Sequence, residues 1–188
     1  MNVYDFDDTI YQGDSTFDFI KECMKQPRCL VSMVLRSWSV IPFVLHLWDK
    51  TKFKSYFFGF IRYINDIDSF LDAFVTRNYH KIKPWYIQQK KQDDVIISAS
   101  PYFLVVGFCK KLGLTHIYGT DMDKTNGKIS GINCKDEAKV TLFRHEFGNE
   151  VIDEFYSDSK TDSPLARIAT KAYLVKDNQR LDWPLEWL

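Results

Sequence analysis

The stretch Asn2–Tyr11, NVYDFDDTIY, places three aspartates between two short apolar runs. The run Val3–Phe6 is predicted to be a buried strand, and Asp5 and Asp7 lie at its end. In a strand this spacing turns both side chains to the same side. Burying ionised carboxylates without partners costs free energy. The stretch therefore predicts either a solvated loop or a site where a cation and an anionic ligand compensate these charges.

The second half of the chain alternates short apolar runs with helical segments. Strands are predicted at 94–98, 116–120, 153–157 and 172–175, helices at 101–112, 135–147 and 163–169, and a hairpin turn at Asn126-Gly127. Strands that alternate with helices form a parallel sheet with right-handed crossovers. The sequence therefore predicts an α/β fold, a Rossmann-like three-layer sandwich with a parallel sheet.

The segment between the first two predicted strands is too long for a simple connection, at about 90 residues. Its apolar residues recur at helical spacing, and it holds most of the aromatic excess of a chain that is 16% aromatic. We expect an inserted all-helical cap domain at 13–84, with the catalytic core formed by 1–12 and 85–188.

Residues 29–48, CLVSMVLRSWSVIPFVLHLW, are apolar enough to suggest a membrane span. Arg36 near the centre and Pro42 argue against a span. On a helical wheel the polar residues form one narrow stripe of Arg28, Ser32, Arg36 and Ser39. We expect the wide apolar arc to be buried in the protein, with peripheral membrane contact through the cap as the alternative.

The composition limits the class of partner and the compartment. Lys plus Arg and Asp plus Glu number 25 each, so no net charge attracts nucleic acid, and we expect no nucleic-acid partner. The four cysteines lack CxxC spacing, which favours reduced cytosolic thiols over a zinc site. Acidic residues near the start argue against a signal peptide. We expect a cytoplasmic protein, with membrane association as the alternative. The oligomeric state is left open.

Polar residues follow the predicted strands at the edge where parallel sheets bind ligands. They are Asp5, Asp7, Ser98, Asp158 and Asp162, with Lys139 near the start of the helix before the fourth strand. A few carboxylates with room for water and phosphate suit Mg²⁺. Aspartate can be a covalent nucleophile, a second carboxylate an acid and base, and ammonium and hydroxyl groups can bind phosphoryl oxygens. The set predicts phosphoryl transfer.

These residues resemble the four motifs of the haloacid dehalogenase-like superfamily, specifically its magnesium-dependent phosphatases. DFDDT resembles DxDx(T/V), VIIS ends in Ser98, Lys139 corresponds to the motif lysine, and SDSKTD resembles the DxxxD-type acidic motif. The helical insertion resembles the cap class of phosphoserine phosphatase. The resemblance covers almost the whole chain and implies a phosphoric monoester hydrolase with Mg²⁺ as cofactor.

The resemblance implies a role for each central residue. Asp5 would be the nucleophile that becomes an aspartyl phosphate. Asp7 would be the general acid and base, with its backbone carbonyl on Mg²⁺. Ser98 would hydrogen-bond the phosphoryl oxygens, and Lys139 would neutralise nucleophile and phosphate. Asp158 would bind the metal, so that Asp5, Asp7 and Asp158 form the implied metal set.

Three further positions have supporting roles in the same resemblance. Thr9 would support the loop after the first strand, and Asp162 would act near the metal, through water. Asp14, at the entrance to the cap, matches the position of a substrate-contacting acid in phosphoserine phosphatases. Lys135 remains the rival of Lys139 as the motif lysine.

Finer details resemble the phosphatidylglycerophosphatase C branch: ISASP, YSDSKTDSPL and NCKDEAKV. They imply a lipid or amphiphilic phosphate such as phosphatidylglycerophosphate. The alternatives are a soluble small-molecule phosphatase such as phosphoserine phosphatase and, in another class, a non-catalytic binding protein on a phosphatase fold. An acceptor other than water also stays open.

Overall fold

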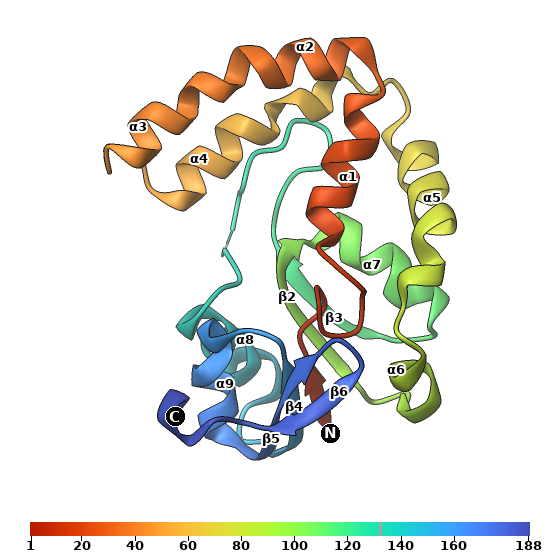
Figure 1. Cartoon of the computed structure of the whole chain (residues 1–188), viewed down its shortest axis with the longest axis vertical. Helices are drawn as coiled ribbons and strands as arrows, with labels where there is room; N and C mark the ends of the chain where they lie inside the picture. The colour runs from red at the N-terminus through yellow and green to blue at the C-terminus, as the bar shows by residue number, and fades with distance from the viewer. Residues whose placement is uncertain (132) are drawn as a thin grey trace.

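A six-stranded sheet forms the centre of the computed structural model, which describes residues 1–131 and 133–188 (Figure 1). The strands are β1 (Asn2–Tyr4), β2 (Val95–Pro101), β3 (His116–Thr120), β4 (Ile152–Ser157), β5 (Ala169–Lys176) and β6 (Gln179–Asp182). The order is β3-β2-β1-β4-β5-β6, and β6 pairs antiparallel with β5 while the other neighbours pair parallel. The predicted α/β fold is confirmed, and the edge strand β6 is an addition to it.

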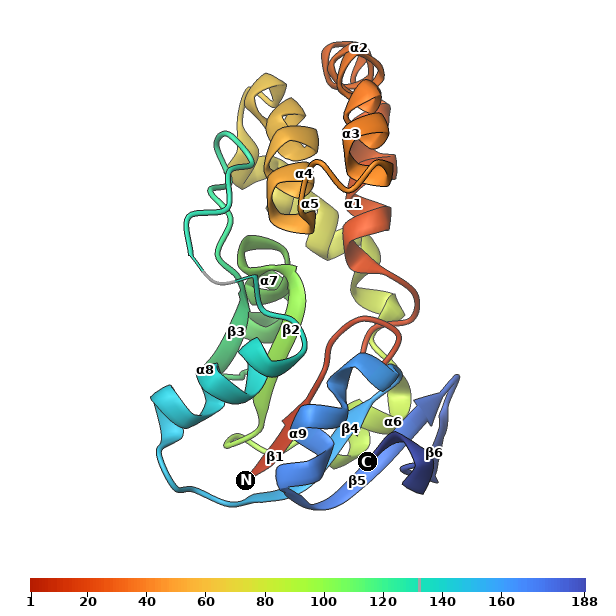
Figure 2. The ribbon, with the colours of Figure 1, turned by 90° about the vertical axis from the view of Figure 1, so that its left-hand side faces the viewer.

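Helices cover both faces of this sheet, which gives three layers (Figure 2). They are α6 (Pro84–Gln89) and α7 (Tyr102–Lys111) on one face, and α8 (Glu137–Phe147) and α9 (Ser163–Ile168) on the other, with the 3-10 helices η4 (Lys160–Asp162) and η5 (Leu185–Trp187) near the C-terminus. Successive residues of β1 explain the layers. Tyr4 packs with Phe108 of α7, whereas Val3 packs with Phe143 of α8 and Leu165 of α9.

Apart from isolated bridges at Asp7, Tyr11 and Ile82, the regular structure between β1 and β2 is helical, as predicted. It comprises α1 (Ser15–Met24), α2 (Pro27–Arg36), η1 (Ser37–Ser39), α3 (Val40–Val44), α4 (Lys50–Phe57), η2 (Phe58–Tyr63), α5 (Ile67–Asn78), η3 (Tyr79–Lys81) and α6. Figure 1 shows α2 and α3 running away from the sheet and α4 returning beside them. The division into a cap at 13–84 and a core stays a prediction.

Ser32, Arg36 and Ser39 of the predicted polar stripe face inward while Arg28 is exposed, so the expectation that the apolar arc is buried is wrong for most of that arc. The Arg36 guanidinium donates to the Tyr56 carbonyl at 2.7 Å and lies 4.8 Å from that ring centroid. Gly59 provides the space for this guanidinium, because a Cβ at that position would lie 2.5 Å from Arg36 Nη1. Ser32 and Ser39 are buried. Polar groups therefore share the space between the helices with Cys29 and Met33, and most of the large apolar groups face outward.

Ten large apolar side chains between positions 30 and 47 are 38–72% exposed and form what we call the apolar ridge. They are Leu30, Val31, Val34, Leu35, Trp38, Val40, Ile41, Val44, Leu45 and Leu47. In the described part of the chain no helix is long and apolar enough to cross a membrane.

Residues 121–131, here called the strap, connect the end of β3 to the approach to α8 by way of α4. The predicted hairpin turn is a turn closed by an isolated Met122–Ile129 bridge. The Ile129 N–H donates to Ser55 Oγ of α4 at 3.1 Å. Gly127 lies against Phe58 so closely that a Cβ would meet the Phe58 carbonyl oxygen at 2.3 Å. The strap therefore packs on the helical segment although it is continuous with the sheet.

Candidate active site

A cavity of about 380 Å³ lies beyond the carboxyl ends of β1, β2 and β4. Its lining includes six aspartates (5, 7, 8, 14, 158 and 162) and three lysines (54, 135 and 139), together with Thr16, Ser98, Ala99, Ser100, Ser159 and Thr161. The structure thus brings together at one cavity every predicted site residue except Thr9, and Thr9 contacts one member of the set. Carboxyl groups thus outnumber amines in this lining by six to three.

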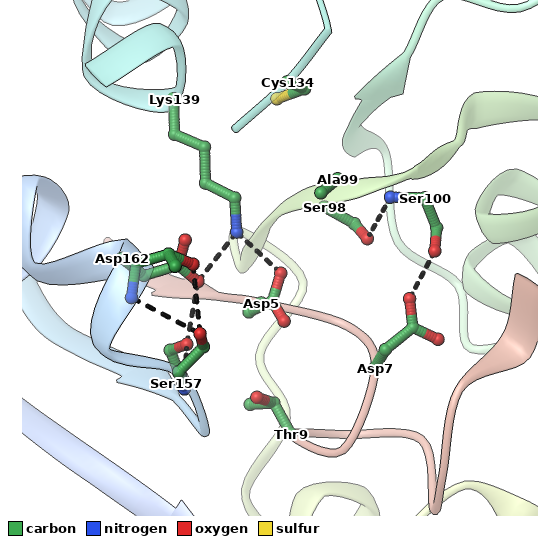
Figure 3. Close-up of polar contacts among 12 residues, drawn as sticks. Asp5, Asp7, Thr9, Ser98, Ala99, Ser100, Cys134, Lys139, Ser157 and Asp162 are labelled. Carbon is green, nitrogen blue, oxygen red and sulfur yellow. Dashed lines mark hydrogen bonds and ion pairs between the residues drawn. The ribbon is translucent and has the colours of Figure 1, made fainter. Parts of the chain in front are cut away.

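Asp5 and Lys139 form the floor of this cavity. Lys139 Nζ lies 2.7 Å from Asp5 Oδ1 and 2.8 Å from Asp162 Oδ2 (Figure 3). Burial raises the pKa of Asp5, although Lys139 opposes this effect. Burial acts to lower the pKa of Lys139, but the two carboxylates outweigh it and hold the pKa above its ordinary value. The ammonium therefore stays charged between them.

Asp7 is held by hydrogen bonds from two directions. The Ser15 N–H donates to Asp7 Oδ1 at 2.6 Å. The Ser100 hydroxyl donates to Asp7 Oδ2 (Figure 3). The Ser100 hydroxyl also lies 2.8 Å from that of Thr16. Burial raises the pKa of Asp7 against the effect of these hydrogen bonds. The environment thus favours the protonated form, which a general acid needs.

Ser98 lies where the β2–β3 pairing becomes irregular, and its buried hydroxyl accepts from the Ser100 N–H at 3.0 Å. Thr9 links the first loop to the loop after β4, because Thr9 Oγ1 accepts from the Asp158 N–H at 3.1 Å. Burial, followed by the negative charge of Asp8, raises the pKa of Asp158 to about 6. Asp158 therefore lies among negative charges that a cation would compensate.

Asp162 is buried and accepts from Lys139 and, at 2.7 Å, from the Ser157 hydroxyl. It thus fixes the lysine. Asp14 caps α1 by accepting from the Phe17 N–H at 2.8 Å and also lines the cavity. The rival lysine, Lys135, lines the same cavity, whereas the contact with Asp5 is made by Lys139.

Sequence reasoning missed Ser100, Ser157 and Lys54. The i, i+2 spacing from Ser98 along a strand could have indicated Ser100. Ser157 precedes the acidic motif directly. No local signal indicates Lys54, which reaches the cavity from α4.

The donors around the cavity fit Mg²⁺ in chemistry. Within residues 1–131 and 133–188, no cluster of three or more His, Cys, Asp or Glu side chains forms a ready-made metal cage. Mg²⁺ usually binds through one or two carboxylates and keeps several waters. The carboxylates of Asp5 and Asp158 and the backbone carbonyl of Asp7 could provide such a partial set, and the raised pKa of Asp158 fits a place for a cation.

Known proteins share this fold at low sequence identity. A protein of unknown function from Bordetella pertussis Tohama I has a TM-score of 0.72 at 14% identity, covering 93% of this chain and 88% of that one. A phosphoserine phosphohydrolase-like protein from Francisella tularensis subsp. tularensis SCHU S4 has a TM-score of 0.57 at 15% identity, covering 93% and 87%.

Sequence comparison gives a nearer relationship over part of the chain. A histidinol-phosphatase of Neisseria meningitidis serogroup C (strain 8013) is 26% identical over 117 residues, which are 52% of this chain and 53% of that protein. The match thus spans about half of that curated relative. Residues 3–167 match the model of the haloacid dehalogenase-like hydrolases. With the shared sheet topology and this match over most of its length, the chain belongs to the haloacid dehalogenase-like hydrolase family.

Proposed function

We propose that this protein is a Mg²⁺-dependent phosphomonoesterase that acts through an aspartyl phosphate on Asp5. The observation that carries this proposal is the buried Lys139, ion-paired to Asp5 at the floor of a cavity that Asp7 also lines. A charged lysine keeps the neighbouring carboxylate available as a nucleophile and offers a positive charge to a phosphoryl group.

The chain's own residues account for both steps of hydrolysis. Lys139 binds Asp5 Oδ1, so we assign Oδ2 as the oxygen that attacks phosphorus while the ester P–O bond breaks. Protonated Asp7 gives its proton to the leaving oxygen. Asp7 then takes a proton from water as the water oxygen bonds to phosphorus and the Asp5–phosphorus bond breaks. Bound Mg²⁺, held by Asp5, Asp158 and the Asp7 carbonyl, would neutralise charge on the nucleophile and phosphoryl group.

The remaining residues would position this machinery. Ser98 would donate to a phosphoryl oxygen. Thr9 would hold the Asp158 loop, Asp162 would fix Lys139, and Asp14 would contact the substrate near the entrance. Residues 13–84 would act as the cap over the core of 1–12 and 85–188.

The test is hydrolysis of p-nitrophenyl phosphate, with and without EDTA, by the wild type and by Asp5→Asn. We expect EDTA to abolish activity and the variant to lose more than about a thousandfold. Asp93→Asn, in an exposed turn, is the matched control and should keep full activity. Full activity of Asp5→Asn would refute the proposal and favour a non-catalytic binding protein or another site.

We further propose an amphiphilic substrate such as a lipid phosphate, presented at an anionic membrane surface. The apolar ridge supports this proposal. Between positions 27 and 63 the side chains of Arg28, Lys52 and Arg62 are exposed, and Asp49 is the one acidic residue of that range. An apolar face flanked by cations suits an anionic lipid surface.

A soluble ester such as phosphoserine is the alternative substrate. Rates on phosphatidylglycerophosphate in mixed micelles and on phosphoserine would separate the two. A preference for phosphoserine would refute the lipid proposal.

A further inference from the structure

Two of the three lysines at the cavity have no role in the mechanism above. Lys54 projects from α4, which lies beyond the carboxyl ends of the strands in Figures 1 and 2, and Lys135 precedes α8. The amine of Lys50, at the start of α4, lies close enough to the Lys135 amine to lower the pKa of Lys135. Two amines from distant parts of the chain thus line the cavity, and that of Lys50 lies near one of them.

These amines lack the carboxylate partners that Lys139 has. Among the described residues, Lys139 pairs with Asp5 and Asp162, and no ion pair within 4.0 Å involves Lys50, Lys54 or Lys135. The pKa of Lys54 is lowered by burial and then by the charge of Lys135. The pKa of Lys135 is lowered by the nearby Lys50 amine and then by burial. Gathered like charges are unfavourable unless an anion joins them.

The position of Lys54 indicates which part of a substrate it would meet. Lys54 lines the same cavity as Asp14 and Asp7, and it reaches that cavity from α4, which lies beyond the carboxyl ends of the strands. A substrate whose phosphoryl group meets Asp5 at the floor would therefore turn its leaving group toward Lys54. The scissile phosphoryl group has its own partners at the floor, in Lys139 and Ser98. A cavity of about 380 Å³ also leaves room for more than that group.

We propose that Lys54 and Lys135, with Lys50 beside them, form a subsite for a second anionic group in the leaving-group part of the substrate. The group is a carboxylate or a phosphodiester, so the preferred substrates are phosphomonoesters that carry two acidic groups. This inference rests on the proposed phosphomonoesterase activity, and it assigns the substrate class of that site.

Three probes that share a glycerol phosphate unit test the subsite. Glycerol 3-phosphate has no second anion, 3-phosphoglycerate has a carboxylate, and glycerophosphoglycerol phosphate has a phosphodiester. Binding is measured by calorimetry on Asp5→Asn with Mg²⁺, and kcat/KM on the wild type. We expect at least one dianionic probe to bind about tenfold more tightly than glycerol 3-phosphate, as charge-assisted hydrogen bonds allow. The probe that binds more tightly then shows whether the second anionic group is a carboxylate or a phosphodiester.

The variant Lys54→Gln should remove this preference and leave kcat/KM for p-nitrophenyl phosphate within about twofold. Lys52→Gln, on the same helix but exposed and outside the cavity lining, is the control for charge and should keep the preference. Equal binding of all three probes, or an equal loss for all in Lys54→Gln, would overturn the inference. Because the calorimetric comparison needs no turnover, it separates failure of the subsite from failure of the phosphatase proposal.

Discussion

Replacing Lys139 by Met removes the charge at the floor of the cavity and keeps a similar side-chain length. Lys139 is 2% exposed, and its ammonium lies 2.7 Å from Asp5 Oδ1 and 2.8 Å from Asp162 Oδ2. The variant leaves two buried carboxylates without their cation. Breaking a buried ion pair from one side costs about 3–5 kcal/mol. We therefore expect the free energy of unfolding at pH 7 to fall by this amount, a large part of a typical total of about 5–15 kcal/mol.

The assay is urea unfolding followed by far-UV circular dichroism, in EDTA so that metal cannot replace the lost charge. Lys81→Met is the control, since Lys81 pairs with Asp18 at 2.6 Å but its side chain is 28% exposed. Such a pair contributes about 0–1 kcal/mol. Folded Lys139→Met should also lose more than about a hundredfold in hydrolysis of p-nitrophenyl phosphate.

A loss of stability no greater than that of Lys81→Met would refute the reasoning. It would mean that the carboxylates of Asp5 and Asp162 are compensated by something other than this lysine.

Three further predictions concern other parts of the molecule. Burial raises the pKa of Asp94 from 3.8 to about 6, so between these values the folded state binds a proton that the unfolded state has released. The wild type should therefore lose about 3 kcal/mol of stability as the pH rises from 4 to 7. Asp94→Asn should not show this loss, and thermal melts over this pH range measure it. The double variant Leu35→Ser, Ile41→Ser on the apolar ridge should bind phosphatidylglycerol vesicles at least about tenfold less in co-sedimentation, with unchanged hydrolysis of p-nitrophenyl phosphate. Gly127 has φ +76°, and a Cβ there would clash with the Phe58 carbonyl. Gly127→Ala should therefore lower the free energy of unfolding by about 1–3 kcal/mol in urea unfolding.

Each of these predictions has its control or contrary outcome. Parallel pH profiles of wild type and Asp94→Asn would contradict the first. Ridge variants that still bind vesicles, or that instead turn a dimer into a monomer in sedimentation velocity, would contradict the second. Gly113→Ala controls the third, because φ is +78° there but no atom lies within 4 Å of the added Cβ. An equal loss of stability in both variants would mean that backbone strain alone, and not the contact with Phe58, sets the cost.

Local patterns predicted most of the sheet and the residues at its edge. Apolar runs with turn residues after them gave β2, β3, β4 and β5, because buried parallel strands need continuous apolar sequence. The exposed β6 has no such run and went unpredicted. Asp5 and Asp158 follow their strands directly and Ser98 lies within β2, so the parallel order of the strands was enough to bring them together.

Local sequence patterns could not predict the features that depend on how a helix is oriented against its neighbours. A helical wheel shows that α2 has two faces but not which one packs inward. The carbonyl of Tyr56 and the space over Gly59 decide which face packs inward. Tyr56 lies 20 residues beyond Arg36 in the sequence, and Gly59 lies further still. Lys54 reaches the cavity for the same reason, because α4 folds back over the sheet.

The strap gives the helical segment a third attachment. A rotation about two hinges at 13 and 84 would have to break the Ser55–Ile129 hydrogen bond and the Lys124–Asp68 ion pair. The same chain continues to Lys135 and then to Lys139. An outward movement of α4 that keeps these contacts would carry the strap with it, and the strap leads along the chain to two of the three cavity lysines, so we expect cap opening to shift the charges that face the substrate.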